Sequence, residues 1–223
     1  MKILNLYACL GGNRYKWDQV TDVEVTAVEL DPVAAKLYQE RFPNDKVVVG
    51  DAHEYLLNHY KEFDFIWSSP PCPTHSRVPY SQKNTESYVP RYADMKLYQE
   101  IIFLKTHFDG LYCVENVIPY YKALIPADIR GRHLYWANFS LPVSLSNRKP
   151  EIGMCSGKRK FVPEREIIEA LCKFHDYDFF KYDGKQRRIK MARNLVDYQA
   201  GKSILRAAIK ALVSKNAKQL ELI

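Results

Sequence analysis

The chain has 223 residues, of which 47% are hydrophobic and 13% aromatic, enough to fill the core of one domain. Its formal net charge of +7 suits a polyanionic partner but does not require one. The five scattered cysteines argue against a disulfide framework or a zinc ribbon and favour a reducing compartment. No apolar stretch is long enough to cross a bilayer, so we expect no membrane partner.

Short apolar runs alternate with helical patterns along the first half of the chain. The expected strands are residues 2–7, 24–28, 46–49, 63–67 and 111–114, and the expected helices are residues 32–42, 52–60 and 91–108. This alternation predicts an α/β fold with a doubly wound, mostly parallel sheet and right-handed crossovers. Such sheets bind ligands at the carboxyl ends of their strands.

The helical pattern weakens after Phe139. Residues 140–190 contain scattered prolines, glycines and basic residues, with one helical piece near residues 163–174. Regular helical periodicity returns at residues 199–213. We therefore expect a main domain of residues 1–139 plus 191–223, and a small lobe of residues 140–190.

Three successive strand ends carry glycines or acids. Gly11 and Gly12 follow the first strand, Glu29 ends the second about 20 residues later, and Asp51 follows the third. A glycine turn lets backbone approach a ligand, and an acid after the second strand typically binds a ribose. Each could also be ordinary, as a plain turn, a solvated carboxylate or a helix cap such as Asp31. Together they favour a nucleoside ligand.

Cys72 follows two prolines at the tip of the fourth strand. Free cysteine is commonly just a small buried residue, but prolines fix the backbone and therefore the direction of the thiol. Glu115 lies at the tip of the fifth strand and could reach the same pocket, or could cap a helix beginning near Ile118. The two residues are candidates for a shared reactive site.

In their order and spacing these motifs resemble those of the cytosine-5 DNA methyltransferases that depend on S-adenosylmethionine. The matching elements are residues 6–12 (LYACLGG), Glu29-Leu30-Asp31, Gly50-Asp51, Pro70-Pro71-Cys72, Glu115-Asn116-Val117, Arg130-Gly131-Arg132 and residues 199–203 (QAGKS). The resemblance implies a Rossmann-like class I methyltransferase fold. It makes the main domain catalytic and the 140–190 lobe a target-recognition region.

The resemblance also implies a covalent mechanism on a cytosine flipped out of the base stack. Cys72 would add to C6 and Glu115 would protonate N3. Arg132, alone or with Arg130, would hold the exocyclic oxygen and orient Glu115. After methyl transfer to C5, a base would remove the C5 proton and the thiolate would leave. Residues 74–92 would form the loop that closes over the base.

The implied ligands are S-adenosylmethionine, with no metal, and double-stranded DNA, bound by a monomer in the cytoplasm of a prokaryote or phage-infected host. The implied cofactor-binding residues, with Glu29 on the ribose and Asp51 on the adenine, are Tyr7, Ala8, Leu10, Gly11, Gly12, Glu29, Leu30, Asp51, Ala52, Pro70, Lys202 and Ser203. The expected DNA contacts are Ser76, Arg77, Arg91, Lys158, Arg159, Lys160, Arg187 and Arg188.

Four positions depart from the family pattern, namely Cys9, Pro73, Asp128 and Lys202. Lys202 stands where the family typically carries asparagine, next to the methionine end of the cofactor. It could be an ordinary surface lysine. It could also recognise an extra carboxylate, in which case carboxy-S-adenosylmethionine would be the cofactor and 5-carboxymethylcytosine the product.

Three other functions stay open. An N4-cytosine amino-methyltransferase shares the Ser69-Pro70-Pro71 opening but needs no thiol. An RNA cytosine-5 methyltransferase, with transfer RNA as its expected substrate, would use the same catalytic residues. An inactive nucleic-acid-binding module is disfavoured because both Cys72 and Glu115 are present. Covalent trapping on 5-fluorocytosine would separate an enzyme from such a module.

Overall fold

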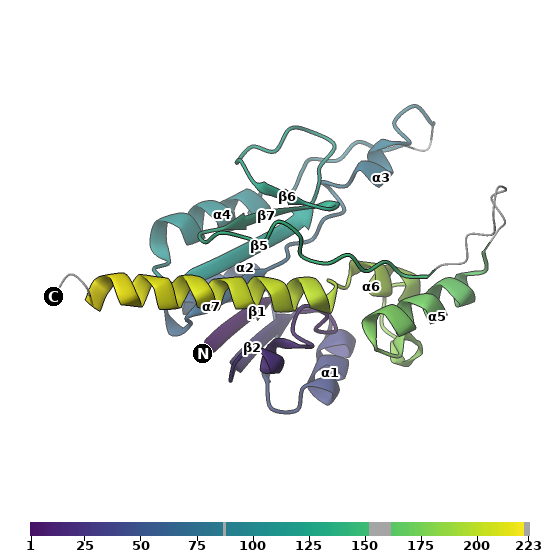
Figure 1. Cartoon of the computed structure of the whole chain (residues 1–223). Coiled ribbons are helices and arrows are strands. Elements are labelled where there is room, and N and C mark those ends of the chain that lie inside the picture. The colour runs from purple at the N-terminus through teal and green to yellow at the C-terminus, as the bar shows by residue number, and fades with distance from the viewer. Residues whose placement is uncertain (87, 152–161, 221–223) are drawn as a thin grey trace.

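The computed structural model describes residues 1–86, 88–151 and 162–220, and for residues 215–220 the backbone alone. These residues form a seven-stranded sheet in the order β3-β2-β1-β4-β5-β7-β6 (Figure 1). Its strands are β1 (Lys2–Leu6), β2 (Glu24–Glu29), β3 (Lys46–Val49), β4 (Phe65–Ser68), β5 (Leu111–Val117), β6 (Asp128–Arg130) and β7 (His133–Ala137). Strand β7 is antiparallel to both neighbours and the other pairs are parallel. The predicted Rossmann-like, doubly wound α/β fold is confirmed.

The strand order places a crevice at the centre of the sheet. The chain begins at β1, moves outward through β2 to β3, and then returns to the other side of β1 at β4. The connections after β1 and β4 therefore leave in opposite directions along the sheet. Ligands of doubly wound sheets bind at this reversal, beyond the carboxyl ends of the strands.

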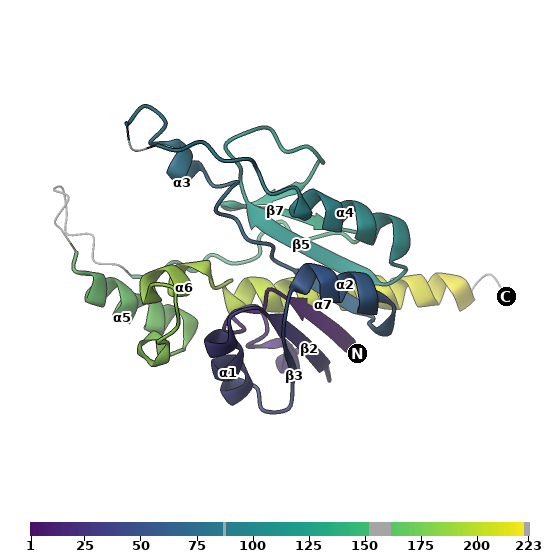
Figure 2. The ribbon, with the colours of Figure 1, turned by 180° about the vertical axis from the view of Figure 1, so that it is seen from behind.

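Helices cover both faces of the sheet because its central strands are apolar on both sides. Helix α7 (Tyr198–Leu220) packs Ala200, Ile204 and Leu205 against one face, together with Trp17 of the 3₁₀ helix η1 (Trp17–Gln19) (Figure 1). Helices α2 (Ala52–His59) and α4 (Lys96–His107) cover the opposite face, which lies in front in Figure 2. Burial on two sides is typical of parallel sheets.

Helix α1 (Pro32–Arg41) packs Tyr38 and Phe42 against Ala27 of β2. As predicted, Asp31 caps this helix, because its Oδ1 accepts the N–H of Val33 at 2.9 Å. The 3₁₀ helix η2 (Tyr60–Glu62) follows α2 directly. The cap fixes the angle at which the chain leaves β2, and so the position of Glu29 just before it.

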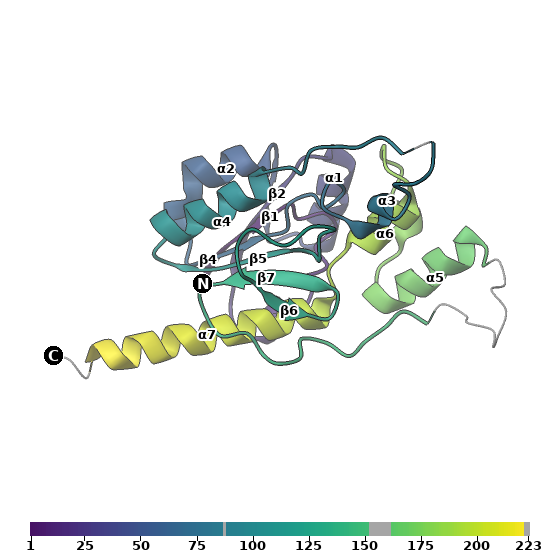
Figure 3. The ribbon, with the colours of Figure 1, turned by 90° about the horizontal axis from the view of Figure 1, so that it is seen from above.

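The lobe that follows the sheet contains α5 (Glu164–His175), the 3₁₀ helix η3 (Phe179–Lys181) and α6 (Arg188–Asn194). Its apolar residues share one cluster with Leu10 and Leu37 of the main domain. The short α3 (Arg77–Tyr80), α5 and α6 lie at the same end of the molecule, whereas the carboxyl end of α7 projects from the opposite end (Figure 3). The expected boundary at residue 190 falls inside α6, and the division into domains stays a prediction.

Several local expectations need correction. Strands β6 and β7 form a hairpin that we did not predict, because β6 has three residues, too few for a periodic signal. Gly131 has φ +61° in its two-residue turn, as such hairpins require. Helix α4 begins at Lys96, later than the predicted residue 91. Strand β5 continues through Glu115 to Val117, so the alternative role of Glu115 as a helix cap is wrong.

Candidate active site

The carboxyl ends of the central strands open into a cavity of about 1330 Å³. Its wall includes Tyr7 and Glu29 on the β1–β2 side and Cys72, Glu115 and Arg132 on the β4–β5 side. Residues 183–186 and several residues of α6 and the segment after it also line the cavity. Residues predicted to hold a nucleoside cofactor, such as Glu29, and residues predicted to react with a base, such as Cys72, therefore line one continuous space.

The turn after β1 is closely packed. Tyr7, Cys9 and Gly11 all have positive φ, at 56°, 49° and 70°. A Cβ at Gly11 would lie 2.3 Å from Cε2 of Phe42, and one at Gly12 would lie 2.4 Å from the carbonyl oxygen of Val196. Both positions therefore require glycine, and the turn is held between α1 and the segment after α6.

Glu29 joins this turn to the end of β2. Its Oε2 accepts the N–H of Cys9 at 2.8 Å, and its Oε1 accepts the N–H of Asp31 at 2.9 Å. Burial raises the pKa of Glu29, although the backbone hydrogen bonds oppose the rise. A carboxylate has about four acceptor positions, so two remain for hydroxyl groups in the cavity.

Asp51 combines a cap with a place in the cavity wall. Its Oδ1 accepts the N–H groups of His53 and Glu54 at the start of α2, and its Oδ2 lies 3.4 Å from Nζ of Lys96. Desolvation acts against ionisation, but these hydrogen bonds and the Lys96 charge lower the pKa of Asp51. The structure thus supports the capping interpretation and also keeps Asp51 at the cavity.

A buried carboxylate that we did not single out stands behind the cofactor end. Glu100 of α4 accepts hydrogen bonds from Tyr7 Oη at 2.5 Å and Ser68 Oγ at 2.6 Å, and lies 3.0 Å from His53 Nδ1. The hydrogen bond to Glu100 raises the pKa of His53. The sequence held a signal, since Glu100 lies on the apolar stripe of Leu97 and Leu104, where a charge must find buried partners.

The structure brings most, but not all, of the predicted cofactor residues to the cavity. Those that line it are Tyr7, Ala8, Gly12, Glu29, Leu30, Asp51, Ala52 and Pro70. Leu10 is fully buried in the lobe cluster, and Gly11 lies behind the wall. Lys202 and Ser203 also lie outside it, because Lys202 Nζ donates to Gln19 Oε1 at 2.8 Å and Ser203 Oγ donates to the Leu145 carbonyl at 3.1 Å.

Cys72 lies half-exposed at the other end of the cavity, directly after Pro70 and Pro71. Asn116 Nδ2 donates to the carbonyl of Pro70 at 2.9 Å and so ties this segment to β5. Burial and the neighbouring Glu115 raise the pKa of the Cys72 thiol, and the positive charges of Lys190 and Arg132 oppose the rise.

Glu115 lies within β5, opposite Tyr135 of β7, and is nearly buried. Its Oε1 lies 3.5 Å from Nε2 of His133. Arg132 lines the cavity, whereas Arg130 does not. The guanidinium of Arg130 donates to the Pro142 carbonyl at 2.7 Å and lies 3.4 Å from Asp128, which turns it away from Glu115.

The loop after Cys72 is anchored to the segment that follows β5. Ser76 caps α3 through the N–H of Val78, and Arg77 Nε donates to the Pro119 carbonyl at 3.0 Å. The ring of Tyr80 stacks on that of Tyr120 at 4.5 Å. Ser76 and Arg77 line the cavity, but Arg91 is exposed and does not.

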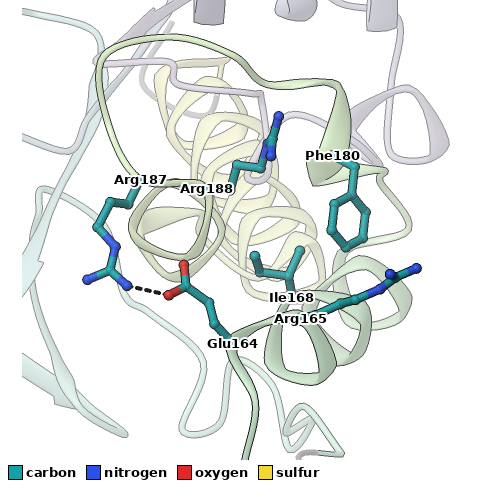
Figure 4. A pocket seen from close by; sticks show the side chains of 6 residues that line it. All are labelled: Glu164, Arg165, Ile168, Phe180, Arg187 and Arg188. Carbon is teal, nitrogen blue, oxygen red and sulfur yellow. Dashed lines mark hydrogen bonds and ion pairs between the residues drawn. The ribbon is translucent and has the colours of Figure 1, made fainter.

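The basic residues of the lobe that were predicted to contact DNA fall into two groups. Lys158, Arg159 and Lys160 lie outside the described residues. Arg187 and Arg188 line a separate cavity of about 480 Å³, in which Figure 4 shows Arg187 directed toward its ion-pair partner Glu164. The other residues around this cavity are Arg165, Ile168 and Phe180.

Sequence analysis also missed contributions of the lobe to the large cavity. Lys185, Gln186 and Lys190 line it, whereas the sequence analysis named only Arg187 and Arg188 of this segment, as DNA contacts. Met191 of α6 reaches the glycine turn, where its sulfur accepts from Cys9 Sγ at 3.2 Å. Sequence spacing gives no signal for these contacts, because they depend on how the lobe folds back over the sheet.

Fold and cavity together define a Rossmann-like α/β protein with acids suited to a nucleoside at one end of its cavity and a thiol with a carboxylate at the other. Within the described residues, no helix has the length and apolarity to cross a membrane. Those residues also contain no group of three or more His, Cys, Asp or Glu side chains that could hold a metal ion.

The model of one family, described as C-5 cytosine-specific DNA methylase, matches residues 1–101. The match includes the glycine turn, Glu29, Asp51 and the Pro-Pro-Cys motif, and it ends before Glu115. No curated protein sequence matches the chain significantly.

Several solved structures are similar to this chain at low identity. The Entamoeba histolytica methyltransferase EhMeth has 10% identity and a TM-score of 0.43, with 93% of this chain and 95% of that chain covered. A TehB-like SAM-dependent methyltransferase from Corynebacterium glutamicum has 18% identity and a TM-score of 0.34, covering 52% and 54%. A putative DNA modification methyltransferase encoded within an Escherichia coli prophage has 20% identity and a TM-score of 0.36, covering 55% of this chain and 33% of that one.

Proposed function

We propose that this protein transfers a methyl group from S-adenosylmethionine to C5 of a cytosine in DNA. The observation that carries the proposal is that Cys72 and Glu115 line the same cavity as Glu29 and the glycine turn. The match of residues 1–101 to the C-5 cytosine-specific DNA methylase model supports the choice of base and of reaction.

The cavity suits two ligands at once. Pockets for a single small molecule usually measure about 300–1,000 Å³, and this one measures about 1330 Å³. Glu29 retains acceptor positions for ribose hydroxyls, and Gly12 lines the cavity beside it. When bound, S-adenosylmethionine supplies an electrophilic methyl group on a sulfonium.

Cys72 provides the nucleophile that cytosine itself lacks. Its thiolate forms the Sγ–C6 bond, and the electron pair of the C5–C6 double bond moves into the ring and makes C5 nucleophilic. Lys190 and Arg132 favour the thiolate, since both lower the pKa of Cys72 against the effects of burial and Glu115. The two cations ease covalent addition by a thiol whose pKa is raised overall.

Glu115 donates the proton that this step requires. As the Sγ–C6 bond forms, the Glu115 O–H bond breaks and N3 takes the proton, so that negative charge does not accumulate on the ring. After C5 is methylated, a water molecule in the cavity takes the C5 proton, the electrons of the C5–H bond re-form the C5–C6 double bond, and the Sγ–C6 bond breaks to release the Cys72 thiolate. N3 then returns its proton to Glu115, and both residues end in their starting states.

The target base must leave the stack to reach this cavity, at a cost of a few kcal/mol. The loop that carries Ser76 and Arg77 borders the cavity beside Cys72 and is positioned to receive it. We place the activity on double-stranded DNA in a cytoplasmic setting, with the protein acting as a monomer and without a metal.

The transferred group in this proposal is methyl rather than carboxymethyl. The ammonium of Lys202 is bound to Gln19, and Lys202 does not line the cavity, so this lysine is not placed to bind an added carboxylate. To bind a carboxylated cofactor, the Lys202 side chain would have to break its hydrogen bond to Gln19 and move to the cavity.

The test is mass spectrometry of nucleosides after the purified protein is incubated with DNA or transfer RNA. Each reaction contains S-adenosylmethionine and carboxy-S-adenosylmethionine in equal amounts. We expect 5-methylcytosine in DNA. N4-methylcytosine, or no product in either nucleic acid, would overturn the proposed reaction. Product confined to transfer RNA would correct the substrate, and 5-carboxymethylcytosine would correct the placement of Lys202.

A further inference from the structure

His133 is a cavity residue that neither the motifs nor the proposed reaction has used so far. It is the first residue of β7 and pairs with Val117 of β5, two positions beyond Glu115. Its Nε2 lies 3.5 Å from Glu115 Oε1. In the described part of the chain neither Arg130 nor Arg132 forms an ion pair with Glu115, so the group beside the acid is this imidazole.

The surroundings of His133 favour its neutral form. Burial lowers the pKa of His133, Glu115 opposes this change, and the nearby charge of Arg132 adds to it. The other titratable groups that face it are Tyr135 on its own strand, at 6.4 Å between rings, and Arg130, its partner on β6, whose guanidinium is bound elsewhere. A neutral imidazole with its proton on Nε2 is a hydrogen-bond donor toward Glu115.

A neutral donor suits an acid better than a permanent cation does. A guanidinium pairs with a charged carboxylate rather than with the neutral acid that N3 requires. A neutral N–H fixes one oxygen without imposing that charge. At the present 3.5 Å the two atoms are in contact but form no hydrogen bond, and catalytic contacts often tighten only when substrate binds.

We propose that His133 is a positioning residue for Glu115, which it holds through an Nε2–H···Oε1 hydrogen bond. The other carboxyl oxygen, Oε2, then carries the proton to N3. When that proton has moved, Glu115 is a carboxylate and the same hydrogen bond becomes charge-assisted and stronger. His133 therefore stabilises the state formed by proton transfer more than the state before it. This inference rests on the proposed function.

The experiment compares two polar substitutions in a single-turnover assay of 5-methylcytosine formation. His133→Gln places an amide N–H near the position of Nε2. His133→Asn ends near the position of Nδ1 and cannot reach Oε1. We expect His133→Asn to slow turnover about 10- to 100-fold, the effect of losing a hydrogen bond to a charged group. We expect His133→Gln to keep most of the wild-type rate, and both variants to bind DNA and unfold as the wild type does.

A double-mutant cycle then tests whether His133 acts through Glu115. In a Glu115→Gln background, His133→Asn should cause no further loss, because the acid it positions is already absent. Wild-type turnover in His133→Asn, equal losses in both variants, or a full additional loss in the Glu115→Gln background would overturn the inference. If the wild-type protein forms no 5-methylcytosine, the proposed function fails as well, so the two failures are distinguishable.

Discussion

The two ends of the large cavity differ in how the protein satisfies their polar groups. At the cofactor end, Glu29 accepts two backbone N–H groups, Asp51 caps α2 and contacts Lys96, and Tyr7 is bound to Glu100. At the chemical end, Cys72 has no side-chain hydrogen bond among the described residues, and Glu115 has one long contact with His133.

This difference corresponds to the two tasks proposed for the cavity, cofactor binding at one end and reaction with the base at the other. At the cofactor end the polar side chains are already paired within the protein before any ligand arrives, which lowers the cost of ordering them on binding. The chemical end leaves a thiol and a carboxyl group whose best partners are the atoms of a target base. Preorganised groups aimed at developing charge are the means by which a site favours a transition state over a ground state.

The largest expected effect is at Cys72. Cys72→Ser should abolish 5-methylcytosine formation, because a hydroxyl is far less ionised than a thiol near neutral pH. Binding of S-adenosylmethionine, measured by calorimetry, should remain near wild type, since the Cys72 thiol is expected to touch the base rather than the cofactor. Cys172→Ser, in the lobe and away from the cavity, is the matched control and should turn over normally. Unimpaired turnover by Cys72→Ser would refute covalent catalysis.

Glu115→Gln is expected to have the second largest effect. The amide keeps the shape of the side chain but cannot give a proton to N3, so single-turnover rates should fall by about 10²–10⁴-fold. DNA affinity, measured by fluorescence anisotropy, should change little. If both the rate and the affinity are unchanged, Glu115 has only a structural place in β5 and the chemical end is misassigned.

Glu29 tests the opposite end. In Glu29→Gln the side-chain amide cannot accept from both Cys9 and Asp31, so the glycine turn loses one of its anchors and the ribose loses an acceptor. We expect about 10- to 100-fold weaker binding of S-adenosylmethionine by calorimetry, with DNA affinity retained. Glu24→Gln, at the exposed start of the same strand, serves as the control. Equal cofactor binding by both variants would remove Glu29 from the cofactor site.

The smallest expected effect is electrostatic and concerns Lys190. Because burial raises the pKa of Cys72, its alkylation by iodoacetamide should still accelerate as the pH rises past 9, the ordinary value. Lys190→Gln removes a cation that opposes this rise, so alkylation near pH 8 should slow by about two- to fivefold. Arg187→Gln, outside the cavity, should not change it. Peptide mass spectrometry at Cys72 provides the rate, and equal rates in all three proteins would mean that Lys190 does not act on the thiol.

At each end of the cavity the sequence predicted several lining residues and missed a polar neighbour, Glu100 at one end and His133 at the other, for a physical reason. Glycines, caps and strand-terminal acids act through local backbone geometry, and local geometry leaves signals at short spacing, as Asp31 and Glu29 illustrate. His133 approaches Glu115 because β7 pairs with β5. The chain reaches β7 from β5 through the short strand β6, which forms a hairpin with β7. No sequence period reports such pairing.

Lys202 illustrates the limit of motif position as evidence. Its place in the last matching motif led to a prediction about the cofactor, yet its ammonium donates a hydrogen bond to Gln19 of η1. Motif position does not report such a tertiary partner. Glu100 illustrates the opposite case, since its place on an apolar stripe could have been noticed and its three partners could not.

The most direct test of the central claim is covalent trapping on a DNA duplex that contains 5-fluorocytosine, in the presence of S-adenosylmethionine. Fluorine at C5 prevents the loss of a C5 proton, so an enzyme that has added its thiol to C6 stays attached. We predict a protein–DNA adduct that survives denaturing electrophoresis and whose linked peptide, by mass spectrometry, contains Cys72. Absence of an adduct from a preparation that methylates ordinary cytosine, or attachment through another residue, would contradict the account.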